Sequence, residues 1–136
     1  MSDVTVKRLE EFEEMGYKGL HMYFARRGLG VTSFGISVIT IEPNNENYPE
    51  HDHSPAGKGG EMFGDRPDQL EQEEVYTVLE GAATLSAGGE EWRLEPGVFA
   101  RIAAGQARKF VTGAEGVKLL ALGATPGEPF DTGPEG

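Results

Sequence analysis

The chain has 136 residues, a length that corresponds to a single domain with one hydrophobic core. It contains no cysteine, which excludes disulfides, thiolate zinc sites and cysteine nucleophiles. Its formal net charge of -11 argues against binding to nucleic acid or to an anionic membrane, because both need a basic protein surface. No apolar run approaches the roughly 20 residues of a membrane span, and the polar start lacks the apolar stretch of a signal peptide. The sequence therefore predicts a cytoplasmic protein.

Residues 4–15 form the first segment with a regular pattern. Four apolar side chains follow one another at three-residue spacing among Lys, Arg and Glu, which predicts a short amphipathic helix. An apolar run at residues 20–25 then predicts a strand. We expect residues 1–30 to pack as an N-terminal helix and strand on the main body of the domain.

Short apolar runs separated by turn residues make up the chain from there to residue 124. They predict strands at residues 31–41, 75–79, 83–87, 91–94, 98–102, 108–112 and 117–124. The pair Gly88-Gly89 predicts a hairpin turn between two of these strands. Many short strands at near-regular spacing are typical of an all-β sandwich or barrel, so residues 31–124 are expected to form one.

Two segments fall outside this pattern. Residues 54–73 begin with a Gly-rich run, residues 54–60, and form a loop that is long for a compact domain. This loop is either a functional lid or a tolerated surface insertion, and the sequence leaves both open. Residues 125–136 contain several Pro and Gly residues and are expected to form a loosely ordered tail.

A pair of histidines carries the strongest chemical signal. His51 and His53 are one residue apart, so on an extended segment their side chains point to the same side. Glu74, on a following predicted strand, can complete a face of two imidazoles and one carboxylate. Non-haem iron(II) uses this ligand set, and manganese, nickel, cobalt or zinc can also bind to it. Three protein ligands leave coordination positions open for a substrate or for oxygen.

With these residues the chain resembles the cupins, a family of small double-stranded β-helix (jelly-roll) barrels. The first family motif runs Gly, five residues, His-x-His, three or four residues, Glu, six residues, Gly. Four residues match it: His51, His53, Glu74 and Gly81. Asn45 replaces the opening glycine, and the gap before the glutamate is longer than in the family pattern. The resemblance covers residues 35–124 and implies a jelly-roll barrel that holds a small molecule. Because cupins commonly dimerise through their sheets, it also implies a homodimer.

The second family motif runs Gly, five residues, Pro-x-Gly, two residues, His, three residues, Asn, and it is only partly preserved. Gly97 and Gly105 match the two glycines. Ala103, Arg108 and Thr112 stand where the family has Pro, His and Asn. An arginine therefore occupies the position of the fourth family ligand.

Arg108 leaves two alternatives for the interior of the barrel. A permanent cation about 4 Å from a bound metal would interact unfavourably by several kcal/mol per unit charge. Alternatively, Arg108 pairs with Glu74 in a metal-free barrel and stands at the rim as a bidentate anchor for a carboxylate or phosphate. Tyr76 shares a face with Glu74, and Phe110 shares parity with Arg108, so both are expected to contact a ligand.

Two functions follow from these alternatives. In the first, a single-domain cupin binds a small polar or anionic molecule, with or without one divalent metal ion (Fe, Mn, Ni, Co or Zn). In the second, the protein is a metal-dependent enzyme of the oxygenase or isomerase type that acts on a small substrate. The sequence does not decide whether the protein is an enzyme. His21, alone in an apolar run, is expected to be a packed or hydrogen-bonded strand residue.

Overall fold

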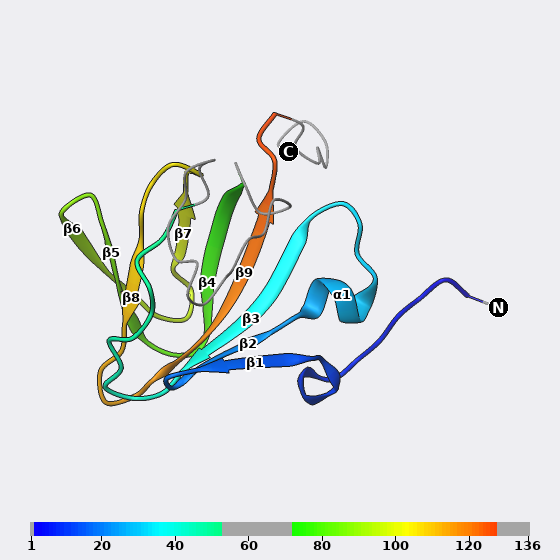
Figure 1. Ribbon diagram of the computed structural model, residues 1–136, viewed down its shortest axis with the longest axis horizontal. Helices are drawn as coiled ribbons and strands as arrows, with labels where there is room; N and C mark the ends of the chain where they lie inside the picture. The colour runs from blue at the N-terminus through cyan, green and yellow to red at the C-terminus, as the bar shows by residue number, and fades with distance from the viewer. Residues whose placement is uncertain (1, 53–71, 128–136) are drawn as a thin grey trace.

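The protein folds into two antiparallel β-sheets (Figure 1). A computed structural model describes residues 2–52 and 72–127. The larger sheet has six strands in the order β1-β2-β3-β9-β4-β7, and the smaller has three in the order β6-β5-β8. The elements are η1 (Leu9–Glu11), β1 (Glu14–Tyr17), β2 (Leu20–Tyr23), α1 (Ala25–Leu29), β3 (Gly35–Ile41), β4 (Glu73–Gly81), β5 (Ala83–Ala87), β6 (Glu90–Leu94), β7 (Phe99–Ile102), β8 (Lys109–Val111) and β9 (Val117–Ala124). The predicted all-β jelly-roll fold is confirmed as two sheets, and the described strands do not close into a continuous barrel.

One hydrophobic core lies between the two sheets. Ile39 of β3 pairs with Leu119 of β9, and paired residues point to the same face of a sheet. From the small sheet, Leu85 and Phe110 belong to the same cluster of buried side chains. Burial alternates strictly along β9 as far as its last residue, which is the pattern of a strand with one face in the core.

The strand predictions are confirmed most closely in the second half of the chain. The observed bounds of β5 and β9 are those predicted, and β6 and β7 differ from the prediction by one residue at one end. Gly88 and Gly89, which join β5 to β6, both have positive φ, at 59° and 79°. A two-residue hairpin turn needs this conformation, and glycine adopts it without steric cost.

The predicted helix at residues 4–15 is wrong. This segment forms only the short 3-10 helix η1 and then β1, which pairs with β2 so that Met15 lies opposite Met22. Between these strands, Lys18 and Gly19 have φ values of 48° and 84°, as a two-residue hairpin turn requires. Three-residue apolar spacing over so short a segment is compatible with a helix or with a strand. The turn and the strand pairing favour the hairpin.

The chain between β2 and β3 also differs from the prediction. The strand predicted for residues 20–25 ends at Tyr23, and the short helix α1 follows it. Gly30 closes this helix in the left-handed conformation, with φ of 77°. The strand predicted from residue 31 begins at Gly35. Aromatic and apolar side chains in this region made helix and strand hard to distinguish by pattern alone.

Part of the prediction lies outside the described residues. Residues 53–71 include His53 and most of the predicted insertion, and residues 128–136 include most of the predicted tail. Among the residues that the structure describes, no helix is long and apolar enough to cross a membrane.

Candidate functional site

Arg108 is fully buried and links two parts of the fold. Its Nη1 donates a hydrogen bond to Oε1 of Glu74 at 2.7 Å. Its Nη2 and Nε donate to the carbonyl oxygens of Ala103 at 2.9 Å and Gln106 at 3.0 Å. The guanidinium therefore joins β4 to the loop between β7 and β8. The predicted position of Arg108 at the rim is wrong, because its exposed fraction is 0% and its fork points into the protein.

Glu74 is the centre of this network. The alternation of β4 places Tyr76 on the same face, and its hydroxyl donates to Oε1 of Glu74 at 2.5 Å. A single carboxylate oxygen thus accepts hydrogen bonds from a phenol and from a guanidinium. The side chain of Glu74 is 14% exposed, whereas Arg108 is completely buried, so the network reaches the surface through Glu74.

Tyr48 is a member of the site that the sequence reading missed. It is 1% exposed, and its ring lies edge-on to Phe110 with a centroid distance of 5.0 Å. The ring of Tyr76 lies 4.8 Å from the same phenylalanine. Burial, and then the charge of Glu74, raise the pKa of both tyrosines above the ordinary value. Both phenols therefore remain neutral hydrogen-bonding groups. In the sequence, the position of Tyr48 between a predicted turn and His51 was the feature that could have indicated its role.

His51 lies beside the network. Its backbone N–H and C=O bond to those of Arg108, with N···O distances of 3.1 and 2.9 Å. The imidazole is buried, with Nδ1 3.2 Å from the carbonyl oxygen of Pro49 and the ring 5.5 Å from that of Tyr48. The structure thus brings His51, Arg108 and Glu74 together. The third predicted metal ligand, His53, lies outside the described residues.

Comparisons with known proteins identify the architecture. No protein-family model and no curated protein matches the sequence. A cupin protein from Bacteroides fragilis has a similar structure, with a TM-score of 0.67, 14% identity and coverage of 96% of this chain and 92% of that one. A cupin-superfamily sugar phosphate isomerase from Silicibacter pomeroyi has a TM-score of 0.65 at 22% identity, with coverage of 90% of this chain and 77% of that one. The Streptomyces protein PAC13, in a structure with uridine, has a TM-score of 0.61 at 11% identity, with coverage of 88% of this chain and 80% of that one.

The chain has the fold of a small cupin. Two of its departures from the cupin motifs lie against one another. Asn45, in place of a glycine, donates its backbone N–H to Oγ1 of Thr112 at 2.9 Å. Thr112, in place of an asparagine, donates its own N–H to the carbonyl of Asn45 at 3.0 Å. Both residues are buried, so the two substituted positions form one hydrogen-bonded contact that holds the segment leading to His51.

The described part of the interior does not fit a metal ion in its present arrangement. Within residues 2–52 and 72–127, no group of three or more His, Cys, Asp or Glu side chains is placed to hold one. Oε1 of Glu74 already accepts two hydrogen bonds, one of them from Arg108. A divalent ion bound to this carboxylate would lie about 4–5 Å from the guanidinium, and their repulsion would be several kcal/mol even at an effective dielectric of 20.

The neighbouring ion pair on β4 shows the other face of the strand. Glu73 pairs with Arg101 of β7, and the side chains are 37% and 65% exposed. Glu73 therefore points outward while Glu74 points inward, as the strand alternation requires. Arg101 is a surface charge. These two adjacent pairs join the same strand to arginines in opposite environments.

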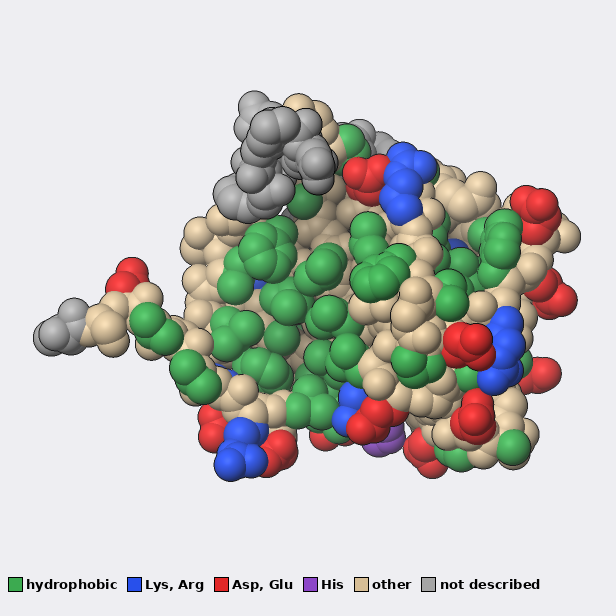
Figure 2. All heavy atoms as spheres, turned by 180° about the vertical axis from the view of Figure 1, so that it is seen from behind, with side chains coloured by type: hydrophobic (Ala, Val, Ile, Leu, Met, Phe, Trp, Pro, Cys, Tyr) green, Lys and Arg blue, Asp and Glu red, His purple; other side chains and the backbone are tan. Residues whose placement is uncertain are grey.

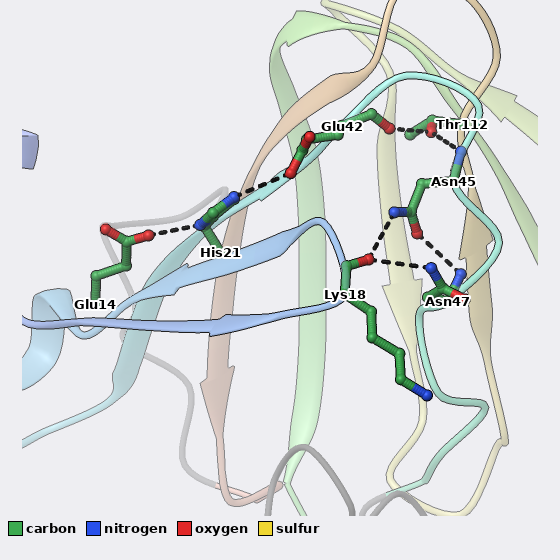
Figure 3. A network of polar contacts seen from close by, with 7 residues as sticks. All are labelled: Glu14, Lys18, His21, Glu42, Asn45, Asn47 and Thr112. Atoms are coloured by element: carbon green, nitrogen blue, oxygen red, sulfur yellow. Dashed lines mark hydrogen bonds and ion pairs between the residues drawn. The ribbon is translucent and has the colours of Figure 1, made fainter.

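His21 does not reach the interior and instead belongs to a surface network (Figure 3). Its Nδ1 lies 2.6 Å from Oε1 of Glu14, and its Nε2 lies 3.3 Å from Oε2 of Glu42. The backbone oxygen of Glu42 in turn accepts a hydrogen bond of 2.6 Å from Thr112. The prediction of a hydrogen-bonded strand residue is confirmed, and the histidine connects β1, β2 and the end of β3.

Protonated His21 is expected to stabilise the fold. Burial alone would lower its pKa, but the hydrogen bonds and charges of Glu14 and Glu42 outweigh burial and raise the pKa above 6.5. Because the folded-state pKa is the higher one, this stabilisation is complete below the unfolded-state pKa. It is lost as the pH rises through the folded-state pKa.

Denaturant unfolding at several pH values from about 5 to 9 tests this linkage. Relative to His21→Gln, the parent protein should lose up to about 1 kcal/mol of unfolding free energy over that range, since the pair is partly exposed. Parallel pH profiles of the two proteins would show that the network contributes no such linkage.

Proposed function

We propose that this protein is a ligand-binding cupin whose interior holds a small polar or anionic molecule without a metal ion. The observation that carries the proposal is the buried ion pair of Arg108 with Glu74, completed by the hydroxyl of Tyr76. The guanidinium supplies the positive charge that a metal ion would otherwise supply to this carboxylate. An anionic ligand could exchange with the carboxylate of Glu74 at Arg108, because carboxylates and phosphates match the same planar fork.

The solved cupin relatives support a small molecule as the ligand. The Silicibacter pomeroyi protein is a sugar phosphate isomerase, and the Streptomyces protein PAC13 was solved with uridine. A sugar phosphate and uridine are both small molecules that carry several polar groups. In our proposal Tyr76 and Phe110 contact the ligand, the first through its hydroxyl and the second through its ring. Tyr48 packs edge-on against the ring of Phe110.

A metal-dependent enzyme of the oxygenase or isomerase type is the second candidate. The observation that favours it is the buried imidazole of His51, held next to the Glu74 network by its backbone bonds to Arg108. With His53, these two side chains would hold the ion, whose role would be that of a Lewis acid and template. This arrangement requires Glu74 to turn away from Arg108.

Thermal-shift measurements with small carboxylates and phosphates test ligand binding. A ligand at about 100 times its dissociation constant should stabilise the protein by about 2.7 kcal/mol, and the shift should be lost in Arg108→Met. Tyr76→Phe, which removes one donor from the site and keeps the ring, should bind more weakly. Arg101→Gln removes an exposed arginine as a matched control and should retain the parent shift. Equal shifts in all four proteins would contradict the proposed site.

Elemental analysis of the untagged protein separates the two candidate functions. If the protein works without a metal ion, it should contain less than about a tenth of an equivalent of any transition metal, before and after incubation with iron, manganese, nickel, cobalt or zinc. Uptake of about one equivalent that is lost in His51→Ala would overturn the metal-free proposal and favour the enzyme.

We also propose a homodimer and a cytoplasmic location. The partner would cover the outer face of the large sheet, where apolar side chains gather (Figure 2). They include Ile36, Val75, Phe99, Leu120 and Leu122. The charged side chains of this face form ion pairs, Glu73 with Arg101 and Glu80 with Lys118, so the face does not add to the net charge of -11 that opposes self-association.

A further inference from the structure

A groove runs between β6 and β7, the edge strands of the two sheets. Its volume is about 630 Å³, within the range of small-molecule sites. The buried side chains of Leu85 and Ile102 form its base, and Trp92 of β6 borders it. Neither Glu74 nor Arg108 lines it, although the groove shares the loop between β7 and β8 with them.

Trp92 points into this groove rather than away from it. It pairs with Leu85 across β5 and β6, so the two side chains share the inner face of the small sheet. Leu85 is 4% exposed, whereas Trp92 remains 44% exposed because it stands on the edge strand. A large indole face is therefore accessible inside a concavity. Phe99 of β7 also borders the groove, but its side chain lies on the outer face of the large sheet, opposite to those of Ala100 and Ile102, so the indole of Trp92 supplies the aromatic surface of the groove.

The charges around the groove favour a cation. Glu90 lies two residues before Trp92 on β6, pairs with Ala87 and so shares the inner face. No described residue forms an ion pair with Glu90. The two arginines of the lining already form ion pairs. Arg93 pairs with Glu95 at 3.1 Å, and Arg101 pairs with Glu73. With a net charge of -11 on the whole chain, the groove attracts positive ligands.

The edges themselves argue against a peptide strand as the occupant. The strands β6 and β7 have only five and four residues, and each carries charged side chains. Short, charged edge strands are the features that prevent pairing with another chain. An indole face and a nearby carboxylate are instead the elements of sites that recognise organic ammonium groups.

We propose that the groove between β6 and β7 is a second binding site, for a small organic ammonium ion with apolar or aromatic substituents. The ammonium lies over the indole of Trp92 and near the carboxylate of Glu90, and the substituents contact the apolar base of the groove. This site is independent of the anionic ligand proposed for the interior, and either can fail without the other.

Fluorescence titration of the whole chain tests this site directly, because Trp92 is the only tryptophan. Benzyltrimethylammonium should quench or shift its emission with a saturable dependence, and benzenesulfonate should not. Glu90→Gln keeps the fluorophore and should raise the dissociation constant at least about fivefold. Glu91→Gln is the matched control, because this residue points to the opposite face of β6 and carries the same charge. It should bind within about twofold of the parent protein.

Calorimetric titration of Trp92→Leu provides the second measurement, since this variant has no fluorophore. Heat of binding seen in the parent protein should disappear in it, while its thermal unfolding remains cooperative. Linear quenching without saturation would overturn the proposal. Equal affinity for benzenesulfonate, or an equal loss in the Glu90 and Glu91 variants, would overturn it as well, because each would indicate collisional quenching or diffuse charge.

Discussion

Replacing Arg108 with alanine is expected to lower the free energy of unfolding by about 3–5 kcal/mol. The change removes the hydrogen bond and the charge that Arg108 provides to the largely buried carboxylate of Glu74. It also removes the donors to the carbonyls of Ala103 and Gln106 and opens a cavity where a fully buried side chain had been. Chemical denaturation monitored by circular dichroism measures this loss.

The adjacent pair on β4 provides the control for this prediction. Arg101→Ala breaks an ion pair of the same chemistry at the surface and should cost less than about 1 kcal/mol. The double variant Glu74→Leu/Arg108→Met removes both charges together, and it should recover much of the stability lost in Arg108→Ala. Similar losses for the two single arginine variants, or no recovery in the double variant, would contradict a buried and mutually dependent pair.

Gly81→Ala is expected to destabilise the protein by about 2–4 kcal/mol. Gly81 has φ of 78°, and a Cβ at this position would collide with the backbone carbonyl of Gly116. That carbonyl accepts the N–H of Ala82 at 3.0 Å, so it cannot move without breaking this bond. The glycine follows a register shift near the end of β4, between Val78 and Glu80. Its place in the cupin motif thus has a steric cause.

Gly89 is the matched control for this variant. Its φ of 79° is almost the same, but a Cβ there would meet no atom within 4 Å. Gly89→Ala should therefore show only the backbone strain of a left-handed residue, about 1 kcal/mol. The difference between the two variants in urea unfolding measures the close approach to Gly116. Equal losses would show that the left-handed conformation alone, and not the close approach to Gly116, requires a glycine at position 81.

The fold was predictable where local patterns and strand alternation act together. The bounds of β5 and β9 follow from apolar runs between strong turn residues. The shared face of Glu74 and Tyr76 follows from the two-residue period of a strand, and the hydrogen bond between them agrees with it. The motif spacing from His51 to Gly81 indicated the cupin fold correctly, although the gap before Glu74 is long.

The N-terminal hairpin could not be separated from a helix by periodicity, because the apolar spacing of residues 4–15 is compatible with both. The turn at Lys18-Gly19 and the pairing of β1 with β2 decide it. Tyr48 was missed for a related reason. Its role depends on the rings of Tyr76 and Phe110, which come from distant parts of the chain.

The residue types available for chemistry could be read from the sequence: a His-x-His pair, a motif glutamate, and an arginine in place of a fourth ligand. The folded chain was needed to show that this arginine is fully buried and bonded to Glu74, rather than placed at a rim. It was also needed to show that Trp92 borders a groove between two sheet edges. The physical reason is that strand alternation selects the face of a side chain, while its burial and partners depend on segments that pack against it from elsewhere in the chain.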